Sequence, residues 1–140
     1  TAPSLQEMGI DVSVITDGMG ATFLGTGEAN LYMTAADLVC MDGTVVNKVG
    51  TLGNAIAAKR FQVPYYAFSV SPDPTKMDAS GIQMEWRSAE EVTQCMGKAT
   101  SSDGMKALYP AFDIISPDLV TGVVAGKGVL KPEEIKRNFQ

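Results

Sequence analysis

The sequence predicts an α/β domain built on a parallel sheet, and two observations lead to this fold class. Short runs rich in β-branched or aromatic residues, typical of buried strands, occur at 12–16, 31–35, 63–70 and 112–115. Helix signals fall between and after these runs, and alternation of strands with helices favours a parallel sheet. The 140 residues match the size of one domain and can bury a substantial core.

The helices are predicted from capping and charge patterns. Ser88 with Glu91 forms a capping-box pattern, and Ser116 followed by Pro117 is typical of a helix start. The last segment has acidic residues first and basic residues last, as the helix dipole favours. These signals predict helices at 88–97, 116–126 and 132–139. The apolar spacing of Val49, Leu52 and Ile56 predicts a further helix at 49–61, and GMGATFLG after the first run predicts one that begins within 18–25.

Composition excludes several classes of function. The net charge is −5 and no basic stripe is present, which argues against nucleic-acid and anionic-membrane partners. No apolar run approaches the roughly 20 residues of a membrane span, and no secretory signal opens the chain. We therefore expect a cytoplasmic protein.

Cysteine and histidine content limits the chemistry. The chain has two cysteines, Cys40 and Cys95, and no histidine. We expect reduced thiols, because nothing in the spacing of the two cysteines indicates a disulfide. The absence of histidine excludes a histidine-dependent triad within this chain and argues strongly against a zinc site, so we expect neither a metal nor a cofactor.

The first residues indicate that the chain belongs to something longer. The sequence begins with Thr1 rather than methionine, and TAPSLQEMG is typical of the end of a helix closed by Gly9. We therefore expect an amino-terminal domain that this chain does not contain.

A hairpin supplies the candidate site. Asp42-Gly43 lies between the apolar stretches LVCM and TVVN, and this pattern predicts a two-residue type I′ loop. In that register Asp37 lies directly opposite Lys48, with Cβ atoms roughly 5 Å apart, and Asn47 lies beside them. The hairpin therefore brings a carboxylate, an amide and an ammonium together at a strand end.

The surroundings of this hairpin leave two interpretations. A helix predicted to begin near Val49 would offer free backbone N–H groups to a phosphate. The alternative is an exposed Asp37–Lys48 ion pair, which would contribute well under ~1 kcal/mol. Asp17, at the end of the 12–16 run, is either a cap for the next helix or a residue of the same crevice.

Four stretches resemble one family in order and spacing, and together they cover nearly the whole chain. They are GIDVSVITDGM (9–19), VNKVGT (46–51), AAKRFQVPYYAF (57–68) and YPAFDIISPDLVTGVVAGKGV (109–129). They resemble the sugar-1-phosphate isomerases of the methylthioribose-1-phosphate isomerase type. The wider family includes ribose-1,5-bisphosphate isomerase and the regulatory subunits of translation initiation factor 2B.

The resemblance implies both an architecture and an activity. Residues 1–140 would form a single Rossmann-like domain, the carboxyl-terminal half of a two-domain protein that forms homodimers. The activity would be aldose–ketose isomerisation of a pentose 1-phosphate, within methionine salvage. Asp37 falls on the family's catalytic acid, and Asn47 and Lys48 fall on its substrate-binding pair. A catalytic cysteine would lie upstream, so this chain alone is expected to be inactive.

Departures from the family pattern narrow the substrate. Leu38 stands where the methylthioribose enzymes usually have arginine, and Asp73 stands where the bisphosphate enzymes carry a lysine. An acid would repel a second phosphate, so methylthioribose 1-phosphate and 5-deoxyribose 1-phosphate are the leading candidates. The alternative function is a non-catalytic module that binds sugar phosphates or nucleotides, like the regulatory relatives.

The implied acid role sets two structural expectations. An aspartate that is protonated when substrate binds needs a dry, apolar site, which residues such as Val39 and Met41 could supply. We also expect Asp37 and Lys48 to form an ion pair in the empty site, and to separate when Lys48 turns to the substrate.

Overall fold

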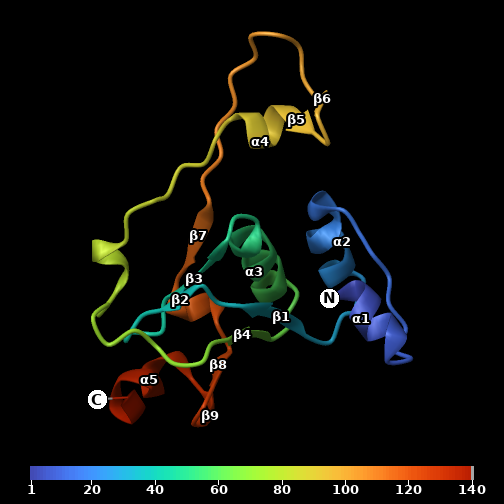
Figure 1. Cartoon of the computed structure of the whole chain (residues 1–140). Coiled ribbons are helices and arrows are strands. Elements are labelled where there is room, and N and C mark those ends of the chain that lie inside the picture. Colours follow the sequence, from blue (N-terminus) through green and yellow to red (C-terminus); the bar gives the residue numbers. More distant parts are fainter. Residues whose placement is uncertain (140) are drawn as a thin grey trace.

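The computed structural model describes residues 1–139, which form a body and one protruding arm (Figure 1). The main sheet of the body has the order β1-β4-β8-β9, in which β1, β4 and β8 are parallel and β9 is antiparallel. Its strands are β1 (Tyr32–Ala35), β4 (Tyr65–Phe68), β8 (Gly122–Ala125) and β9 (Gly128–Leu130). The predicted α/β class with a mostly parallel sheet is confirmed in this sheet.

A second, antiparallel sheet carries the candidate site. It consists of β2 (Leu38–Val39), β3 (Val45–Lys48) and β7 (Phe112–Ile115), with β3 in the centre. A short hairpin in the arm pairs β5 (Gln94–Cys95) with β6 (Lys98–Ala99). The predicted strand at 112–115 therefore exists, but it pairs with the hairpin rather than with the main sheet.

The helices are short, and α3 is the longest of those described. They are α1 (Ala2–Glu7), α2 (Gly20–Gly25), α3 (Thr51–Arg60), α4 (Glu90–Thr93) and α5 (Pro132–Phe139). Single 3₁₀ turns lie at η1 (Asp17–Met19), η2 (Ala79–Gly81) and η3 (Pro117–Leu119). The predictions for α2, α3 and α5 are confirmed: α5 covers its predicted range, and α2 and α3 are shorter by one or two residues at their ends.

The core joins both sheets to α3 and α5. Fully buried side chains from each element meet in one cluster, among them Val45, Tyr65, Ile115, Val123 and Ile135. Helix α3 contributes small residues to the interior, with Ala55 and Ala58 at 0% exposure. These small side chains let the helix approach the sheets closely, which fixes the position of its first turn.

The predicted strand at 12–16 is wrong. In the structure this segment has no regular secondary structure, and Val14 is 82% exposed. Strand β1 begins only at Tyr32 and has β4 as its single ladder partner among the described residues. The β-branched residues of this segment favour a strand, but no strand forms, because no strand among the described residues pairs with the segment.

The predicted helix at 116–126 is also wrong. Ser116 and Pro117 start only the 3₁₀ turn η3, and the chain then enters β8. The valines of GVVA pair with β4 on one side and β9 on the other, so sheet formation overrides the helix-start signal. The helix predicted at 88–97 is confirmed only for α4, and Gly97 lies in the β5–β6 hairpin instead of closing a helix.

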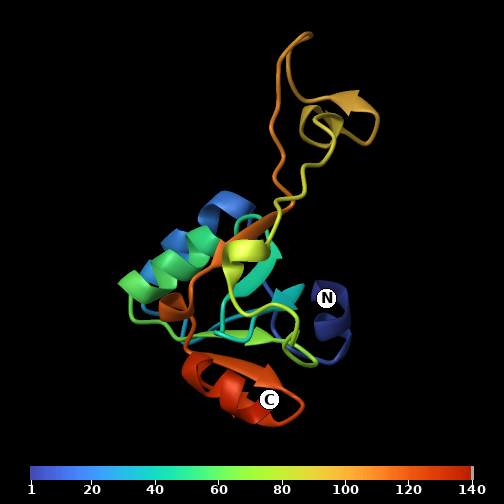
Figure 2. The same cartoon turned by 90° about the vertical axis from the view of Figure 1, so that its left-hand side faces the viewer.

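The arm is formed by residues 84–110 and projects away from the body (Figure 2). At its base the two sides of the arm are joined by backbone hydrogen bonds, from Arg87 N to Tyr109 O (2.9 Å) and from Ala111 N to Glu85 O (2.8 Å). The arm continues directly into β7, so its base lies beside the candidate site.

Candidate functional site

The loop of the β2–β3 hairpin has three residues, not two. Leu38 pairs with Val46 and Val39 with Val45, and Cys40 N donates to Thr44 O at 2.8 Å. Gly43 has φ +89°, as the last residue of such a loop requires. The predicted type I′ register is therefore wrong by one residue.

This shift changes which residue faces Asp37. Just before the first ladder pair, Leu38 with Val46, Asp37 N also donates to Val46 O at 2.9 Å, which holds Asp37 beside the end of β3. The neighbours of the Asn47 amide orient it: its nitrogen lies 3.2 Å from Asp37 Oδ2 and 3.0 Å from Ala35 O, positions for two donated hydrogen bonds. Asp37 and Asn47 thus form the contact that the sequence assigned to Asp37 and Lys48.

Lys48 lies on the other face of β3, because successive strand residues alternate. Its Nζ atom is 5.1 Å from the centre of the Tyr109 ring and 5.8 Å from that of Phe112, a cation–π geometry at the base of the arm. The ion pairs among residues 1–139 do not include Asp37 with Lys48. The predicted ion pair of the empty site is therefore wrong.

Lys48 opens onto a cleft with a volume of about 610 Å³. The start of α3 forms one wall, and residues of the arm form another. The lining residues are Asp17, Tyr32, Lys48, Val49, Gly50, Thr51, Asn54, Glu91, Val92 and Tyr109. Asp17 thus lies in the crevice, as one of its two interpretations required.

Sequence reasoning did not single out Tyr32 as a cleft residue. Its ring stacks on that of Tyr65, with centroids 4.8 Å apart, and burial raises the pKa of its hydroxyl. The hydroxyl therefore stays protonated at neutral pH and can donate a hydrogen bond inside the cleft. No signal in the sequence indicates a role of Tyr32 in the cleft, because the residue lies at the start of a strand and ligand-binding residues were expected at the carboxyl ends.

The first turn of α3 is already capped by a carboxylate. Asp113 Oδ2 accepts hydrogen bonds from Gly50 N at 2.7 Å and from Leu52 N at 2.9 Å. These two N–H groups are not free for a phosphate, contrary to the expectation from the sequence. In this chain the positive group available to an anion in the cleft is the Lys48 side chain.

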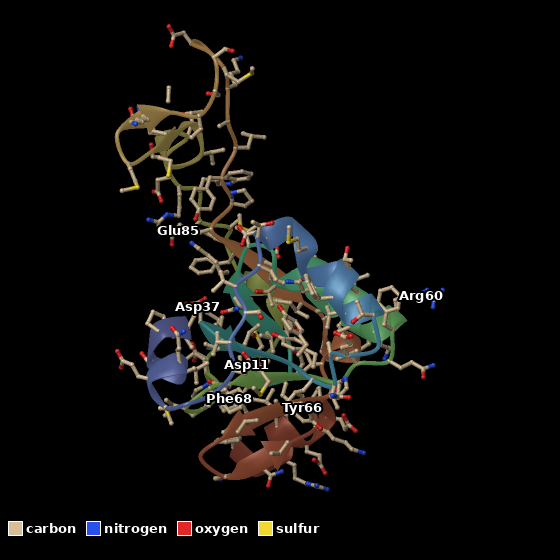
Figure 3. The ribbon with its side chains drawn as sticks, turned by 90° about the vertical axis from the view of Figure 1, so that its right-hand side faces the viewer. Asp11, Asp37, Arg60, Tyr66, Phe68 and Glu85 are labelled. Atoms are coloured by element: carbon tan, nitrogen blue, oxygen red, sulfur yellow. The ribbon has the colours of Figure 1, made fainter. Side chains whose placement is uncertain are left out.

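The environment of Asp37 is open. The residue is exposed, whereas Val39 and Met41 are buried, at 1% and 2% exposure, and Val39 belongs to the central core cluster. The expected dry, apolar surroundings of the acid are therefore not provided by this hairpin. Figure 3 shows Asp37 on the body, apart from Glu85 at the base of the arm.

Both cysteines are free thiols, as expected. Cys40 is buried in the hairpin, where its Sγ atom donates to Asp78 O at 3.5 Å, and burial raises its pKa to about 11. Cys95 is exposed in the arm. Neither thiol lines the cleft.

Residues 1–139 contain neither a cluster of metal-binding side chains nor a helix that could span a membrane. No group of three or more acidic, cysteine or histidine side chains there is placed to hold a metal ion. No helix in that range has the length and apolar character needed to cross a membrane.

Comparison with known proteins identifies relatives along the whole chain. The model of the Initiation factor 2 subunit family matches residues 1–132. Methylthioribose-1-phosphate isomerase of Thermotoga neapolitana is 41% identical over 98% of this chain and 41% of its own length. The 5-deoxyribose 1-phosphate isomerase of Bacillus cereus is 37% identical over 100% of this chain and 42% of its own length.

The chain also superposes on solved structures of longer proteins. The 5-methylthioribose 1-phosphate isomerase of Pyrococcus horikoshii superposes with a TM-score of 0.88 at 30% identity, over 96% of this chain and 38% of that one. The delta subunit of translation initiation factor eIF-2B from A. fulgidus superposes with a TM-score of 0.85, also at 30% identity, over 94% and 38%. The chain therefore spans about two fifths of the length of these proteins.

Proposed function

This chain belongs to the Initiation factor 2 subunit family, and we propose that it carries part of the active site of a sugar-1-phosphate isomerase. The reaction would convert the ring-closed aldose 1-phosphate of a pentose into the ketose 1-phosphate. The observation that carries the proposal is the cluster at the end of β1 and β3, where the Asp37 carboxyl meets the Asn47 amide next to the Lys48 cleft.

Each residue has a role that its geometry supports. Lys48 would bind the substrate phosphate, because its ammonium borders the cleft and makes no ion pair among residues 1–139. Asn47 would hold Asp37 and contact the sugar through its amide. Asp37 would give its proton to the ring oxygen as the bond from that oxygen to C1 breaks. Hydrogen then moves from C2 to C1, and the C2 hydroxyl gives its proton to the Asp37 carboxylate as C2 becomes the ketone carbon, which restores the acid.

The proposal includes a second half of the site outside this chain. Asp37 is exposed here, and a general acid of this kind acts best where water is excluded. Curated relatives are more than twice as long as the matched region, since this chain covers 41% or 42% of them. We propose that an amino-terminal half closes over Asp37 and supplies further catalytic groups, and that the complete polypeptide forms homodimers in the cytoplasm.

The preferred substrate has one phosphate. The Asp73 carboxylate accepts hydrogen bonds from the Thr75 hydroxyl (2.7 Å) and the Thr75 N–H (2.8 Å). These bonds lower the pKa of Asp73 and keep it charged at neutral pH. Such a charge would repel a 5-phosphate near this loop, which favours methylthioribose 1-phosphate or 5-deoxyribose 1-phosphate, the sugars named for the relatives above.

The test uses the complete polypeptide, meaning this chain joined to the additional length that its relatives have. Proton and phosphorus NMR would follow methylthioribose 1-phosphate, 5-deoxyribose 1-phosphate and ribose 1,5-bisphosphate, with Asp37→Asn beside the wild type. Asp118→Asn is the matched control, because it changes an exposed carboxylate on η3 outside the cleft. We expect one monophosphate to be converted by the wild type and the control and not by Asp37→Asn. Conversion by Asp37→Asn at the wild-type rate would contradict the proposal.

A second candidate is a regulatory module without catalysis. It is supported by the likeness to the delta subunit of eIF-2B, which matches this chain at the same identity as the isomerase structure does. Binding of a sugar phosphate by the folded wild type without conversion would favour this function. The hairpin would then serve to hold a ligand.

A further inference from the structure

We infer that Asp113 and Thr51 are positioning residues that hold the Asn47 amide against Asp37. The inference rests on the proposed function, in which Asp37 is the acid. It states that these two residues orient the Asn47 amide that contacts Asp37. Asp113 fixes the first turn of α3, and Thr51 in this turn contacts Asn47.

Asp113 connects β7 to the start of α3. Its backbone lies opposite Asn47 in the β3–β7 ladder, and its carboxylate accepts from Gly50 N and Leu52 N at 2.7 and 2.9 Å. Hydrogen bonds to a charged acceptor are stronger than neutral ones. Gly50 has φ +102°, so the chain turns sharply between β3 and α3, and the carboxylate holds this turn closed.

Thr51 connects this turn to the hairpin through its side-chain hydroxyl. The residue is 5% exposed, and its hydroxyl oxygen lies 2.7 Å from Lys48 O and 2.9 Å from the Asn47 amide oxygen. Its single hydroxyl hydrogen is shared between these two acceptors. The Asn47 amide is thereby held at its oxygen, while its nitrogen faces Asp37 and Ala35.

The arrangement limits how the amide can rotate. A turn of the amide by 180° would bring its oxygen to the Asp37 carboxylate and to the Ala35 carbonyl oxygen, both of which are acceptors. The Thr51 hydroxyl adds a donor on the opposite side. Without it, only the contacts to Asp37 and Ala35 would orient the amide, and Asp37 itself must be free to move its proton.

The first test measures the NMR signals of the Asn47 side-chain amide in the 140-residue chain without substrate. Thr51→Val removes the hydroxyl at nearly constant shape, and Thr51→Ser restores it. We expect the Asn47 side-chain N–H₂ signals, assigned with Asn47→Ala, to shift and to exchange faster in Thr51→Val than in Thr51→Ser or wild type. Unchanged Asn47 signals in folded Thr51→Val would overturn the inference.

Asp113 is tested with a matched pair in the same way. Asp113→Asn keeps an acceptor oxygen for the α3 turn, so we expect Asn47 signals close to wild type. Asp113→Ala removes the acceptor and should reproduce Thr51→Val, whereas the control Asp118→Asn should change nothing. If Asp113→Ala does not fold, Thr51→Val still decides the outcome.

The second test uses turnover by the complete polypeptide. Thr51→Val should lower kcat by about tenfold to a hundredfold, as for residues that orient a catalytic group, with KM within about threefold of wild type. Thr51→Ser should restore kcat. An equal loss in both variants, or a change in KM alone, would contradict a positioning role. If wild type shows no turnover, the proposed function fails, and the NMR result still decides whether Thr51 orients Asn47.

Discussion

Two segments of this chain have the same strand-forming composition and opposite structures. Residues 12–16 and the hairpin at 38–48 both carry several β-branched residues. The hairpin strands are paired and buried, with Val45 at 0% exposure, whereas Val14 is 82% exposed in a segment without a ladder. The difference shows that a partner strand, rather than propensity, decides where a strand forms and where a site can be built.

The largest expected difference between the two segments is in amide exchange. Central amides of β3, such as Val45 and Val46, should open only with free energies close to global unfolding, several kcal/mol above those of residues 12–16. Hydrogen exchange followed by NMR would measure both. Equal protection in the two segments would show that residues 12–16 form a strand in solution.

Substitutions in the two segments and their neighbours should differ in their effect on the free energy of unfolding. Ile115 is fully buried and lies opposite Val45, so Ile115→Ala should lower the free energy of unfolding by about 2–5 kcal/mol. Val14→Ala, at an exposed position, should change it by less than about 0.5 kcal/mol. Chemical denaturation of both variants measures these values, and a large effect of Val14→Ala would mean that its segment is packed.

The hairpin loop offers a backbone test. Gly43 has φ +89°, and an added Cβ would lie 2.6 Å from Pro132 Cα, so Gly43→Ala should destabilise the chain by about 1–3 kcal/mol. Gly53 in α3 has open space, and Gly53→Ala should stabilise by about 0.5–1 kcal/mol. If Gly43→Ala had no cost in the melting temperature, the three-residue loop would be wrong.

The last effect concerns alkaline pH and has no pH dependence near neutrality. Burial raises the pKa of Cys40 to about 11, above the value near 8.5 of an unfolded thiol. The folded state keeps this proton longer, so the thiol contributes stability at low and neutral pH that is lost as the pH rises toward 11. Cys40→Ala should flatten this alkaline decline relative to wild type. Iodoacetamide at pH 8 should label the exposed Cys95 first, and equal labelling rates would contradict burial of Cys40.

Local patterns in the sequence predicted the parts of the fold that depend on local signals. The strands near 31–35 and 63–70, helix α3 and the terminal helix were all found this way. Errors arose where long-range pairing decides. GVVA became a central strand despite a helix-start signal before it, because β4 and β9 lie on either side of it.

The sequence places Asp37, Asn47 and Lys48 near one another, but it does not predict which of them are in contact. Two-residue and three-residue loops both place glycine after aspartate, and the choice between them moves the partner of Asp37 from Lys48 to Asn47. The role of Asp113 depends on a hydrogen bond from Gly50, which lies 63 residues away in the sequence. Its one sequence signal is an acid inside an otherwise apolar strand, FDII.

In the proposed site Asp37 and Lys48 have separate tasks: Asp37 transfers a proton and Lys48 binds the phosphate. The most direct test of this central claim measures binding by calorimetry and turnover by NMR in the complete polypeptide, with methylthioribose 1-phosphate and 5-deoxyribose 1-phosphate as ligands. Asp37→Asn should keep affinity within about threefold and lose at least about a hundredfold in kcat, whereas Lys48→Met should lose at least about tenfold in affinity. Turnover by Asp37→Asn within threefold of wild type, or unchanged affinity in Lys48→Met, would contradict the account.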